Sequence, residues 1–203
     1  MVRVRGMVIM LSMLYLIGCS YPPLDSTAEL PSDYTYIIGP GDSIEIFVWD
    51  NPDISRGVTV RPDGKINTPL LDDLMASGKT PSELARAIEK GLSKYVRDPL
   101  VAVMVGGFQG IYPQQVRVIN QGGSNSFAKA LPYKIEMSLL DLLIQLGGIG
   151  QFADGNRASI IREINGEQHQ FGIRIDDLLD DGDLTANILI LPGDILIIPE
   201  AFF

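Results

Sequence analysis

Residues 36–49 have the sequence YIIGPGDSIEIFVW, in which the turn Gly39-Pro40-Gly41-Asp42 separates two runs of strand-forming residues. The run before the turn, 34–38, is rich in tyrosine and isoleucine. In the run after it, apolar residues recur at every second position from Ile44 to Val48, which is the period of a strand with one buried face. We therefore expect a strand, a Pro-Gly-Asp turn and a second strand that continues to Trp49.

The same construction returns near the end of the chain. Residues 38–46 are IGPGDSIEI and residues 190–198 are ILPGDILII, so Gly193 and Asp194 take the places of Gly41 and Asp42. This repetition predicts that two subdomains share one small unit of strand, turn and strand. Two copies are too few for a solenoid, which needs about three or more repeats.

Between these copies, the first half of the chain predicts a hairpin and a helix. Short strands at 58–61 and 65–70 flank Pro62-Asp63-Gly64, where proline presets φ and glycine accepts a left-handed conformation. A helix should begin after Thr80, because Pro81 suits the first helical position and Glu83 completes a capping box. Apolar residues at helical spacing continue towards Tyr95, and Asp98-Pro99 should end the helix. A strand is expected at 100–105.

A loop at 106–113 separates this half from a second β/α unit. A strand is expected at 116–119, and a helix between the capping pair Ser138 and Asp141 and the glycines at 147–148. Asn165-Gly166 predicts a tight hairpin between strands at 157–164 and 167–173. A short helix at 176–179 and strands at 187–191 and 195–199 complete the expected elements. The fold class predicted for the whole chain is α+β.

The N-terminus has the features of a targeting segment. Residues 1–18 combine two arginines with an apolar run at 7–17, which is too short to span a bilayer as a helix. The run ends in Leu16-Ile17-Gly18-Cys19, which looks like a bacterial lipobox. We expect cleavage between Gly18 and Cys19 and a lipid on the cysteine thiol; an ordinary signal peptide with an incidental cysteine is the alternative. Ser20 resembles an outer-membrane sorting signal, and residues 19–33, which contain three prolines, are expected to form a lipidated tether.

Composition excludes several classes of function. The formal net charge of the 203 residues is −9. This balance argues against nucleic acid as a partner, because phosphate binding needs a concentration of lysine and arginine. One cysteine and one histidine, His169, leave no internal disulfide, no cysteine-rich zinc site and no Cys/His nucleophilic pair in view. We expect no metal, no cofactor and no catalysis.

Three motifs suggest ligand chemistry but lack a required part. Gly78-Lys79-Thr80 has aspartate at position 73, where a phosphate loop needs glycine. Gly148-Ile149-Gly150 follows a helix, whereas a dinucleotide site follows a strand. The acidic run at 176–183 would place Leu179 and Ile188 at ligand positions of a calcium loop. A solvated acidic turn is the better interpretation of that run, and a weak surface calcium site is the alternative.

Taken in order, the motifs of the first half resemble the polysaccharide export domain of outer-membrane polysaccharide export lipoproteins. The resemblance rests on the segments 36–49, 60–66, 69–71, 78–84 and 95–99, which follow one another behind the lipobox. From about Gln115 onward the chain is similar to a soluble-ligand-binding β-grasp module. The segments 152–157 and 192–200 are closer to the short export proteins found with exosortase systems.

This resemblance implies a division of the chain and a role for its motifs. The expected parts are a signal peptide at 1–18, a lipidated tether at 19–33, a polysaccharide export domain at 34–106 and a β-grasp domain at 114–203. The motif residues are expected to shape the fold and the contacts between subunits: Gly39, Pro40, Gly41, Asp42, Arg61, Pro62, Asp63, Gly64, Gly193 and Asp194.

The resemblance also implies a ring-shaped homo-oligomer, lipid-anchored at the periplasmic face of the outer membrane. Such a ring would take polysaccharide from an inner-membrane assembly and its co-polymerase and pass it on without covalent chemistry. Larger members of the family carry a second β-grasp copy and a C-terminal pore helix. Since this sequence stops at Phe203 directly after a strand, a separate outer-membrane β-barrel is an expected partner. The usual turn of the β-grasp module is replaced around 120–133, so no ligand contact is assigned there.

A second hypothesis is a periplasmic module that binds or senses glycans without a transport role. Four aromatic residues could stack on sugar rings, although such residues more often fill cores: Tyr34, Tyr36, Trp49 and Tyr112. A third, a polysaccharide-modifying enzyme, is disfavoured because no convincing catalytic set emerges from the sequence.

Overall fold

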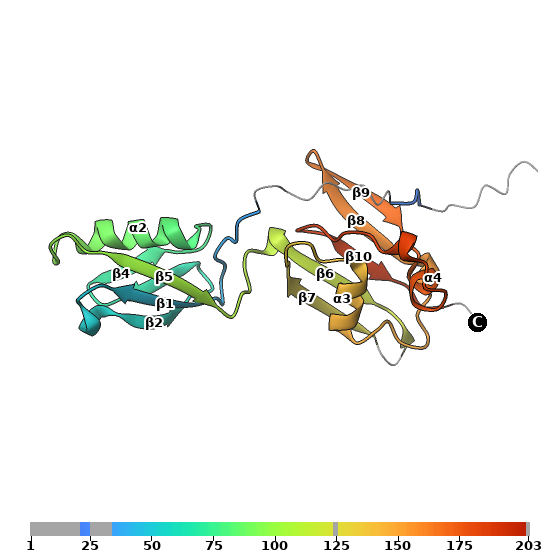
Figure 1. Cartoon of the computed structure of the whole chain (residues 1–203), viewed down its shortest axis with the longest axis horizontal. Coiled ribbons are helices and arrows are strands. Elements are labelled where there is room, and N and C mark those ends of the chain that lie inside the picture. Colours follow the sequence, from blue (N-terminus) through green and yellow to red (C-terminus); the bar gives the residue numbers. More distant parts are fainter. Residues whose placement is uncertain (1–20, 25–33, 124–125, 202–203) are drawn as a thin grey trace, which may run out of the picture.

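The computed structural model describes residues 21–24, 34–123 and 126–201, and Figure 1 shows two units that follow one another along the chain. Both units combine β-sheet with short helices, which confirms the predicted α+β class. The predicted cleavage and lipidation site, Gly18-Cys19, lies outside the described residues, as does most of the predicted tether. In the part of the chain that is described, no helix is both long and apolar enough to cross a membrane.

The first unit is an antiparallel three-stranded sheet with a helix over one face (Figure 1). The strand order is β2-β1-β5, and a separate two-stranded hairpin, β3-β4, lies beside β2 and the helix. The elements are β1 (Ser43–Val48), η2 (Pro52–Ile54), β2 (Arg56–Thr59), β3 (Lys65–Thr68), β4 (Leu71–Met75), α2 (Pro81–Leu92) and β5 (Val101–Gly106).

The core of the first unit follows from the two periods in the sequence. Ile44, Ile46 and Val48 of β1 are each 1% exposed, whereas the residues between them face solvent. Across from them, α2 buries a stripe that includes Leu84 and Ile88. Complete burial of one such side chain contributes about 1.5–3 kcal/mol, so a few of them suffice to hold the helix on the sheet.

The second unit contains a mixed five-stranded sheet in the order β7-β6-β10-β8-β9. Strand β10 is parallel to β6 and antiparallel to β8, and the outer pairs are antiparallel. The elements are η3 (Tyr112–Gln114), β6 (Gln115–Asn120), β7 (Phe127–Pro132), α3 (Leu139–Leu146), η5 (Gly155–Arg157), β8 (Ser159–Ile164), β9 (Glu167–Gly172), α4 (Ile175–Leu179), η6 (Leu184–Ala186) and β10 (Ile195–Ile198).

A second hydrophobic cluster lies between one face of this sheet and the helices α3 and α4. Val116 and Val118 of β6 are fully buried in it, as are Leu139 and Leu142 of α3. The described piece of the N-terminal segment also belongs to this unit, because Leu24 packs on the cluster and its N–H donates to the Gly172 carbonyl at 3.3 Å. Residues 21–24 therefore lie along the edge of the second unit, beside the end of β9.

The predicted helix starts and the predicted hairpin turn are confirmed. Thr80 with Glu83 and Ser138 with Asp141 each form a complete capping box, in which side chain and backbone bond reciprocally. Gly147 ends α3 in the left-handed conformation at φ 83°. Asn165 and Gly166 both have positive φ, 55° and 84°, as a two-residue hairpin of this kind requires.

Several expected elements are wrong or incomplete. Residues 34–38 and 187–191 are not strands: the first bonds through Ile38 to the loop before α2, and the second makes only an isolated bridge at Leu189. Helix α2 ends at Leu92, well before Asp98-Pro99. Strand β3 pairs with β4, which was not predicted, instead of with β2. Strand β7 was also missed, since the expectation for that region concerned only a replaced turn.

Candidate functional site

The first Pro-Gly-Asp turn is organised around the buried carboxylate of Asp42, which is 0% exposed. Its Oδ2 accepts the N–H of Gly39 at 2.9 Å and the hydroxyl of Tyr36 at 2.6 Å. Its Oδ1 accepts the N–H groups of Gln109 at 2.5 Å and of Gly110 at 3.1 Å. Four donors converge on one carboxylate, which is how a buried charge without a cationic partner is compensated.

The Tyr36 hydroxyl is held in its neutral, donating form. Burial raises the pKa of Tyr36 well above its ordinary value, and the hydrogen bond to the Asp42 carboxylate raises it further. A phenolate beside a carboxylate would place two negative charges in a partly buried site. Tyr36, which was considered above as a residue that could stack on a sugar ring, therefore donates a hydrogen bond from its hydroxyl to Asp42 in this structure.

The second turn has the same local geometry around Asp194, which is 1% exposed. Its Oδ2 accepts the N–H of Leu191 at 2.7 Å, and its own N–H donates to the Leu191 carbonyl at 3.2 Å, as Asp42 does with Gly39. Here the remaining partner is Arg162 of β8, whose Nε and Nη2 bond the two carboxylate oxygens at 2.9 and 2.7 Å. Burial raises the pKa of Asp194, and the Arg162 ion pair opposes that rise.

Both turns press against the segment that joins the two units, residues 107–114, which we call the connector. A side chain on Gly39 would overlap the carbonyl of Gly110, and a Cβ on Gly193 would lie 2.7 Å from the Pro113 carbonyl oxygen. Both turns also use glycine at positive φ, 93° at Gly41 and 88° at Gly193. The structure thus brings both predicted turns into contact with one connector, the first at Gly110 and the second at Pro113.

The third predicted motif forms the tip between β2 and β3. The guanidinium of Arg61 pairs with Asp63 and Asp73, each at 2.6 Å, on an exposed surface. After Pro62, the buried Gly64 adopts φ 79° and its carbonyl accepts two N–H groups, from Ala76 and Ser77. The neighbouring Val60 exchanges backbone bonds with the first Pro-Gly-Asp turn, so these two motifs adjoin each other within the first unit.

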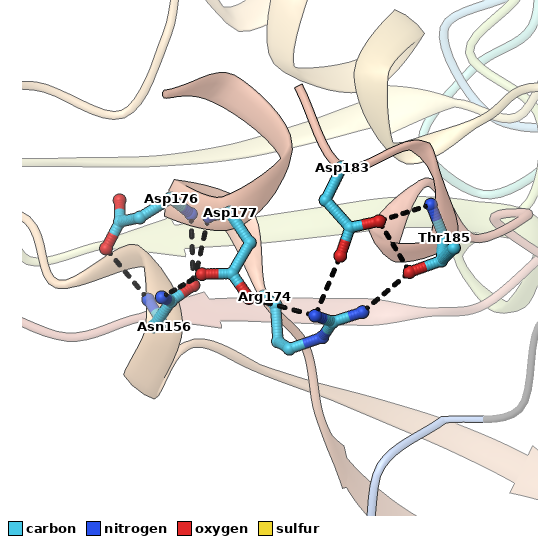
Figure 2. A network of polar contacts seen from close by, with 6 residues as sticks. All are labelled: Asn156, Arg174, Asp176, Asp177, Asp183 and Thr185. Atoms are coloured by element: carbon cyan, nitrogen blue, oxygen red, sulfur yellow. Dashed lines mark hydrogen bonds and ion pairs between the residues drawn. The ribbon is translucent and has the colours of Figure 1, made fainter. Parts of the chain in front are cut away.

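The acidic run that suggested a calcium loop is tied into a protein network, which Figure 2 shows. Arg174 bonds Asp177 and Asp183, each at 2.9 Å, and Thr185 at 2.9 Å. The Asp176 carboxylate accepts the N–H of Asn156 at 3.0 Å, and burial raises the pKa of Asp176. These carboxylates therefore have a cation and backbone donors as partners, and no group of three metal-ligating side chains occurs among the described residues.

An exposed apolar surface lies on the face of the β2-β1-β5 sheet that α2 leaves open. Trp49 and Leu100 are 66% and 63% exposed, Met104 is 50% and Phe47 is 44% exposed. The rings of Phe47 and Trp49 meet edge to face with their centres 6.3 Å apart. We call this set of four residues the apolar face. Its signal was present in the sequence, since the alternation that buries Ile46 also turns Phe47 outward, but only Trp49 was singled out.

Other participants in these sites were missed by sequence reasoning. Arg162, Gln109 and Gly110 were assigned no role, although they supply the partners of Asp194 and Asp42. The available signal for Arg162 was an arginine directly after Ile160 and Ile161 in the strand 159–164. Nothing in the sequence marks the backbone donors of Gln109 and Gly110. His169, which had been given no catalytic role, lies on β9 with its side chain 47% exposed, 4.0 Å from Glu167.

Comparison with known proteins shows which family the first unit is similar to. Residues 30–106 match the family of polysaccharide biosynthesis/export proteins. The chain is 28% identical over 184 residues to the EPS I polysaccharide export outer membrane protein EpsA of Ralstonia nicotianae, which covers 79% of this chain and 46% of that protein. It is 26% identical to the protein of the same name from Ralstonia solanacearum, in an alignment that covers 79% of this chain and 47% of that protein. The chain spans about half the length of these curated relatives. By these matches, the chain is similar over residues 30–106 to the polysaccharide biosynthesis/export protein family.

Proposed function

We propose that this chain is a lipid-anchored component of an exopolysaccharide export machinery, which forms a non-catalytic oligomeric conduit at the periplasmic face of the outer membrane. The match of residues 30–106 to the export family supports the role in export. The outer-membrane name of the EpsA relatives supports the location. Because the chain covers about half of those relatives, the activity and partners of the whole assembly are part of the proposal.

The observation that carries the oligomeric part is the apolar face, formed by Phe47, Trp49, Leu100 and Met104. Large apolar side chains that gather on one exposed surface mark interaction sites, and aromatic residues and methionine are enriched at the centres of protein interfaces. The face lies in the unit that matches the export family. We propose that it packs on a neighbouring copy of the chain.

The turns at 39–42 and 191–194 are proposed to set the angle between a polysaccharide export domain at 34–106 and a β-grasp domain at 114–203. Support comes from the connector, which both turns contact through glycine. A fixed angle matters in a ring because every subunit repeats the same geometry. A small deviation in that angle is repeated in each subunit and would prevent the ring from closing. The hairpin tip around Arg61 lies on the surface of the export domain and is a second candidate for contact between subunits.

The partners in this proposal are an inner-membrane co-polymerase on one side and an outer-membrane β-barrel on the other. The polymer passes through the ring and no bond is made or broken. The acidic composition, with a formal net charge of −9, suits this role because it offers little attraction to anionic polymers.

The test is deletion of the gene followed by complementation. Loss of surface polysaccharide in the deletion strain and its return with the wild-type chain are expected. A chain with Phe47→Ser and Trp49→Ser should accumulate but neither oligomerise, as judged by crosslinking in intact cells, nor restore the polymer. Leu184→Ser is the matched control, because Leu184 is 72% exposed but lies in the other unit.

Two results would each remove a part of the proposal. Normal surface polysaccharide in a deletion strain that has no second copy of the gene would remove the export role. Unchanged crosslinking of the double variant would remove the apolar face as the contact between copies.

The lipid anchor has a separate test. Cys19→Ala removes the thiol that the proposal lipidates, so the variant should lose the lipid and be absent from the outer-membrane fraction. Membrane fractionation with detection of the chain measures this directly. Full recovery of the variant in the outer membrane would contradict the anchor.

A further inference from the structure

The five-stranded sheet has a hollow on the face away from α3, with a volume of about 510 Å³. Its floor is apolar, formed by Ile195 of β10 and Ile161 of β8, which lie directly opposite each other in the strand register. Tyr112 and Pro113 of the connector border it, as does the second Pro-Gly-Asp turn through Gly193. We call this space the sheet hollow. It lies next to the joint between the two units.

Polar side chains surround this floor without being used by the fold. The register places Arg117 beside Ile195, and Glu163 opposite Gln168 on the neighbouring strand pair. Within the described part of the chain, the side chains of Arg117, Glu163 and Gln168 form no hydrogen bond or ion pair. Other charges of this unit are paired, as Arg174 is with Asp177 and Asp183. The sheet hollow therefore offers free donors and free acceptors around an apolar base.

This set of groups selects a class of ligand. Arginine only donates, a carboxylate only accepts and glutamine does both, so a ligand must present groups that both donate and accept. Sugar hydroxyls do so, while the C–H faces of a sugar ring match the isoleucine floor and the ring of Tyr112. A phosphate group would meet the charge of Glu163, and a purely apolar ligand would leave three polar side chains without partners. The volume falls within the range of ligand pockets, about 300–1,000 Å³.

We propose that the sheet hollow is a binding subsite for a hydroxyl-rich, uncharged stretch of the glycan. Tyr112, which is 72% exposed, stacks on one sugar ring. Arg117, Glu163 and Gln168 hydrogen-bond the hydroxyls of the same stretch. The inference rests on the proposed function for the identity of the glycan, and it adds to that function a defined point of contact between chain and polymer, beside the connector.

The experiment uses the wild-type protein extracted from membranes in mild detergent. The probe is a set of short oligosaccharides released by partial acid hydrolysis from the producing strain's own surface polysaccharide, titrated by calorimetry. Tyr112→Ser and Glu163→Gln should each weaken binding about tenfold, the ratio that corresponds to about 1.4 kcal/mol. The matched controls are Tyr95→Ser and Glu167→Gln, since both residues are exposed and lie outside the hollow. They should change the Kd by less than about twofold.

The outcomes separate this inference from the proposed function. Selective weakening by the two hollow variants supports the subsite. No measurable binding by the wild-type protein, or equal effects of hollow and control variants, overturns it. The deletion strain decides the export role independently, because loss of surface polysaccharide there stands whether or not the hollow binds sugar.

Discussion

The two Pro-Gly-Asp turns share their local geometry and differ in what neutralises their aspartate. Asp42 and Asp194 both accept the N–H three residues earlier, and both donate their own N–H back to that residue's carbonyl. The backbone carbonyls of both aspartates also accept an N–H group, from Val60 directly after β2 and from Arg117 of β6. The remaining lone pairs of Asp42 are met by two backbone N–H groups and a phenol, whereas those of Asp194 are met by one guanidinium.

A local motif can therefore fix the geometry of a turn while other parts of the chain determine how the charge of its aspartate is compensated. Dipoles spread over several groups tolerate the loss of one member, because the others remain. A single guanidinium concentrates the compensation in one side chain, and its loss leaves a bare charge. The two turns should therefore respond differently to single substitutions, and the size of the response tests the comparison.

The largest effect is expected from Arg162→Met. The Arg162 and Asp194 side chains are 4% and 1% exposed, so the variant leaves a carboxylate buried without its cation. Loss of one partner from a buried pair costs about 3–5 kcal/mol of unfolding free energy. Denaturant unfolding of the two proteins side by side measures this. Arg174→Met is the control, because the ion pairs of Arg174 are exposed and their loss should cost far less.

The pH dependence of that loss identifies its cause. Without Arg162 only the Leu191 N–H opposes the effect of burial, so the pKa of Asp194 should rise further above its ordinary value. A carboxyl whose pKa is higher in the folded than in the unfolded state binds its proton more tightly when folded, so the deficit of the variant should shrink as pH falls. A deficit that stays constant from neutral to acid pH would mean that lost packing, and not an uncompensated charge, destabilises the variant.

A smaller loss is expected from Asp42→Asn. The amide keeps one acceptor but turns a donor towards the groups that donate to Oδ2, Gly39 and Tyr36. No charge is left unpaired, so the cost should be that of hydrogen bonds to a charged acceptor, about 1.5–3 kcal/mol. Asp63→Asn is the control on the exposed hairpin tip. If Asp42→Asn destabilised as much as Arg162→Met, the contrast between dispersed and concentrated compensation would be wrong.

Tyr36→Phe should cost less again, about 1 kcal/mol, because Asp42 keeps its three backbone N–H donors when the phenol hydroxyl is lost. The clearer effect of Tyr36→Phe is expected on the stability of the protein at alkaline pH. The pKa of Tyr36 is raised in the folded protein, so the unfolded chain ionises first, near pH 10, and stability falls as pH rises beyond that point. Phenylalanine cannot ionise, so the variant should lose less stability between neutral and alkaline pH. Identical alkaline profiles would show that Tyr36 ionises equally well in both states.

Much of this fold could be predicted because its signals are local. Thr80 with Glu83 and Asn165 with Gly166 each act within a few residues, and the structure confirms both. The failures involve partners that are distant in the sequence. Residues 34–38 have the composition of a strand, but Ile38 bonds Gly78 and Lys79 and no neighbouring strand pairs with the segment. Nothing within 65–70 shows that β3 pairs with β4 in place of β2.

The candidate site could also be predicted only where its signals are local. The repeated Pro-Gly-Asp sequence marked both turns, because the glycine and the aspartate each act on their own turn. The partners of the aspartates come from 32 residues away at Arg162 and 67 away at Gln109, and they are set by sheet order and by the path of the connector. The sheet hollow has the same origin in part, since Arg117 joins the hairpin partners Glu163 and Gln168 around one floor only when β10 lies between β6 and β8.

The smallest effects are expected where the two units are alike. Each opens its longest helix with a capping box, and hydrogen bonds from Thr80 and Ser138 lower the pKa of Glu83 and Asp141. A carboxyl with a lowered folded pKa stabilises above its unfolded pKa, and that contribution is lost as pH falls through the folded pKa. Glu83→Gln and Asp141→Asn keep an acceptor but cannot be protonated. Each should therefore reduce, by a similar amount, the fall in Tm that accompanies a decrease in pH. Glu136 is exposed and lies outside both capping boxes, so Glu136→Gln should leave the fall of Tm in acid unchanged. Unequal effects of the two variants would mean that one unit unfolds before the other in acid, because the Tm would then report only the capping box of the less stable unit.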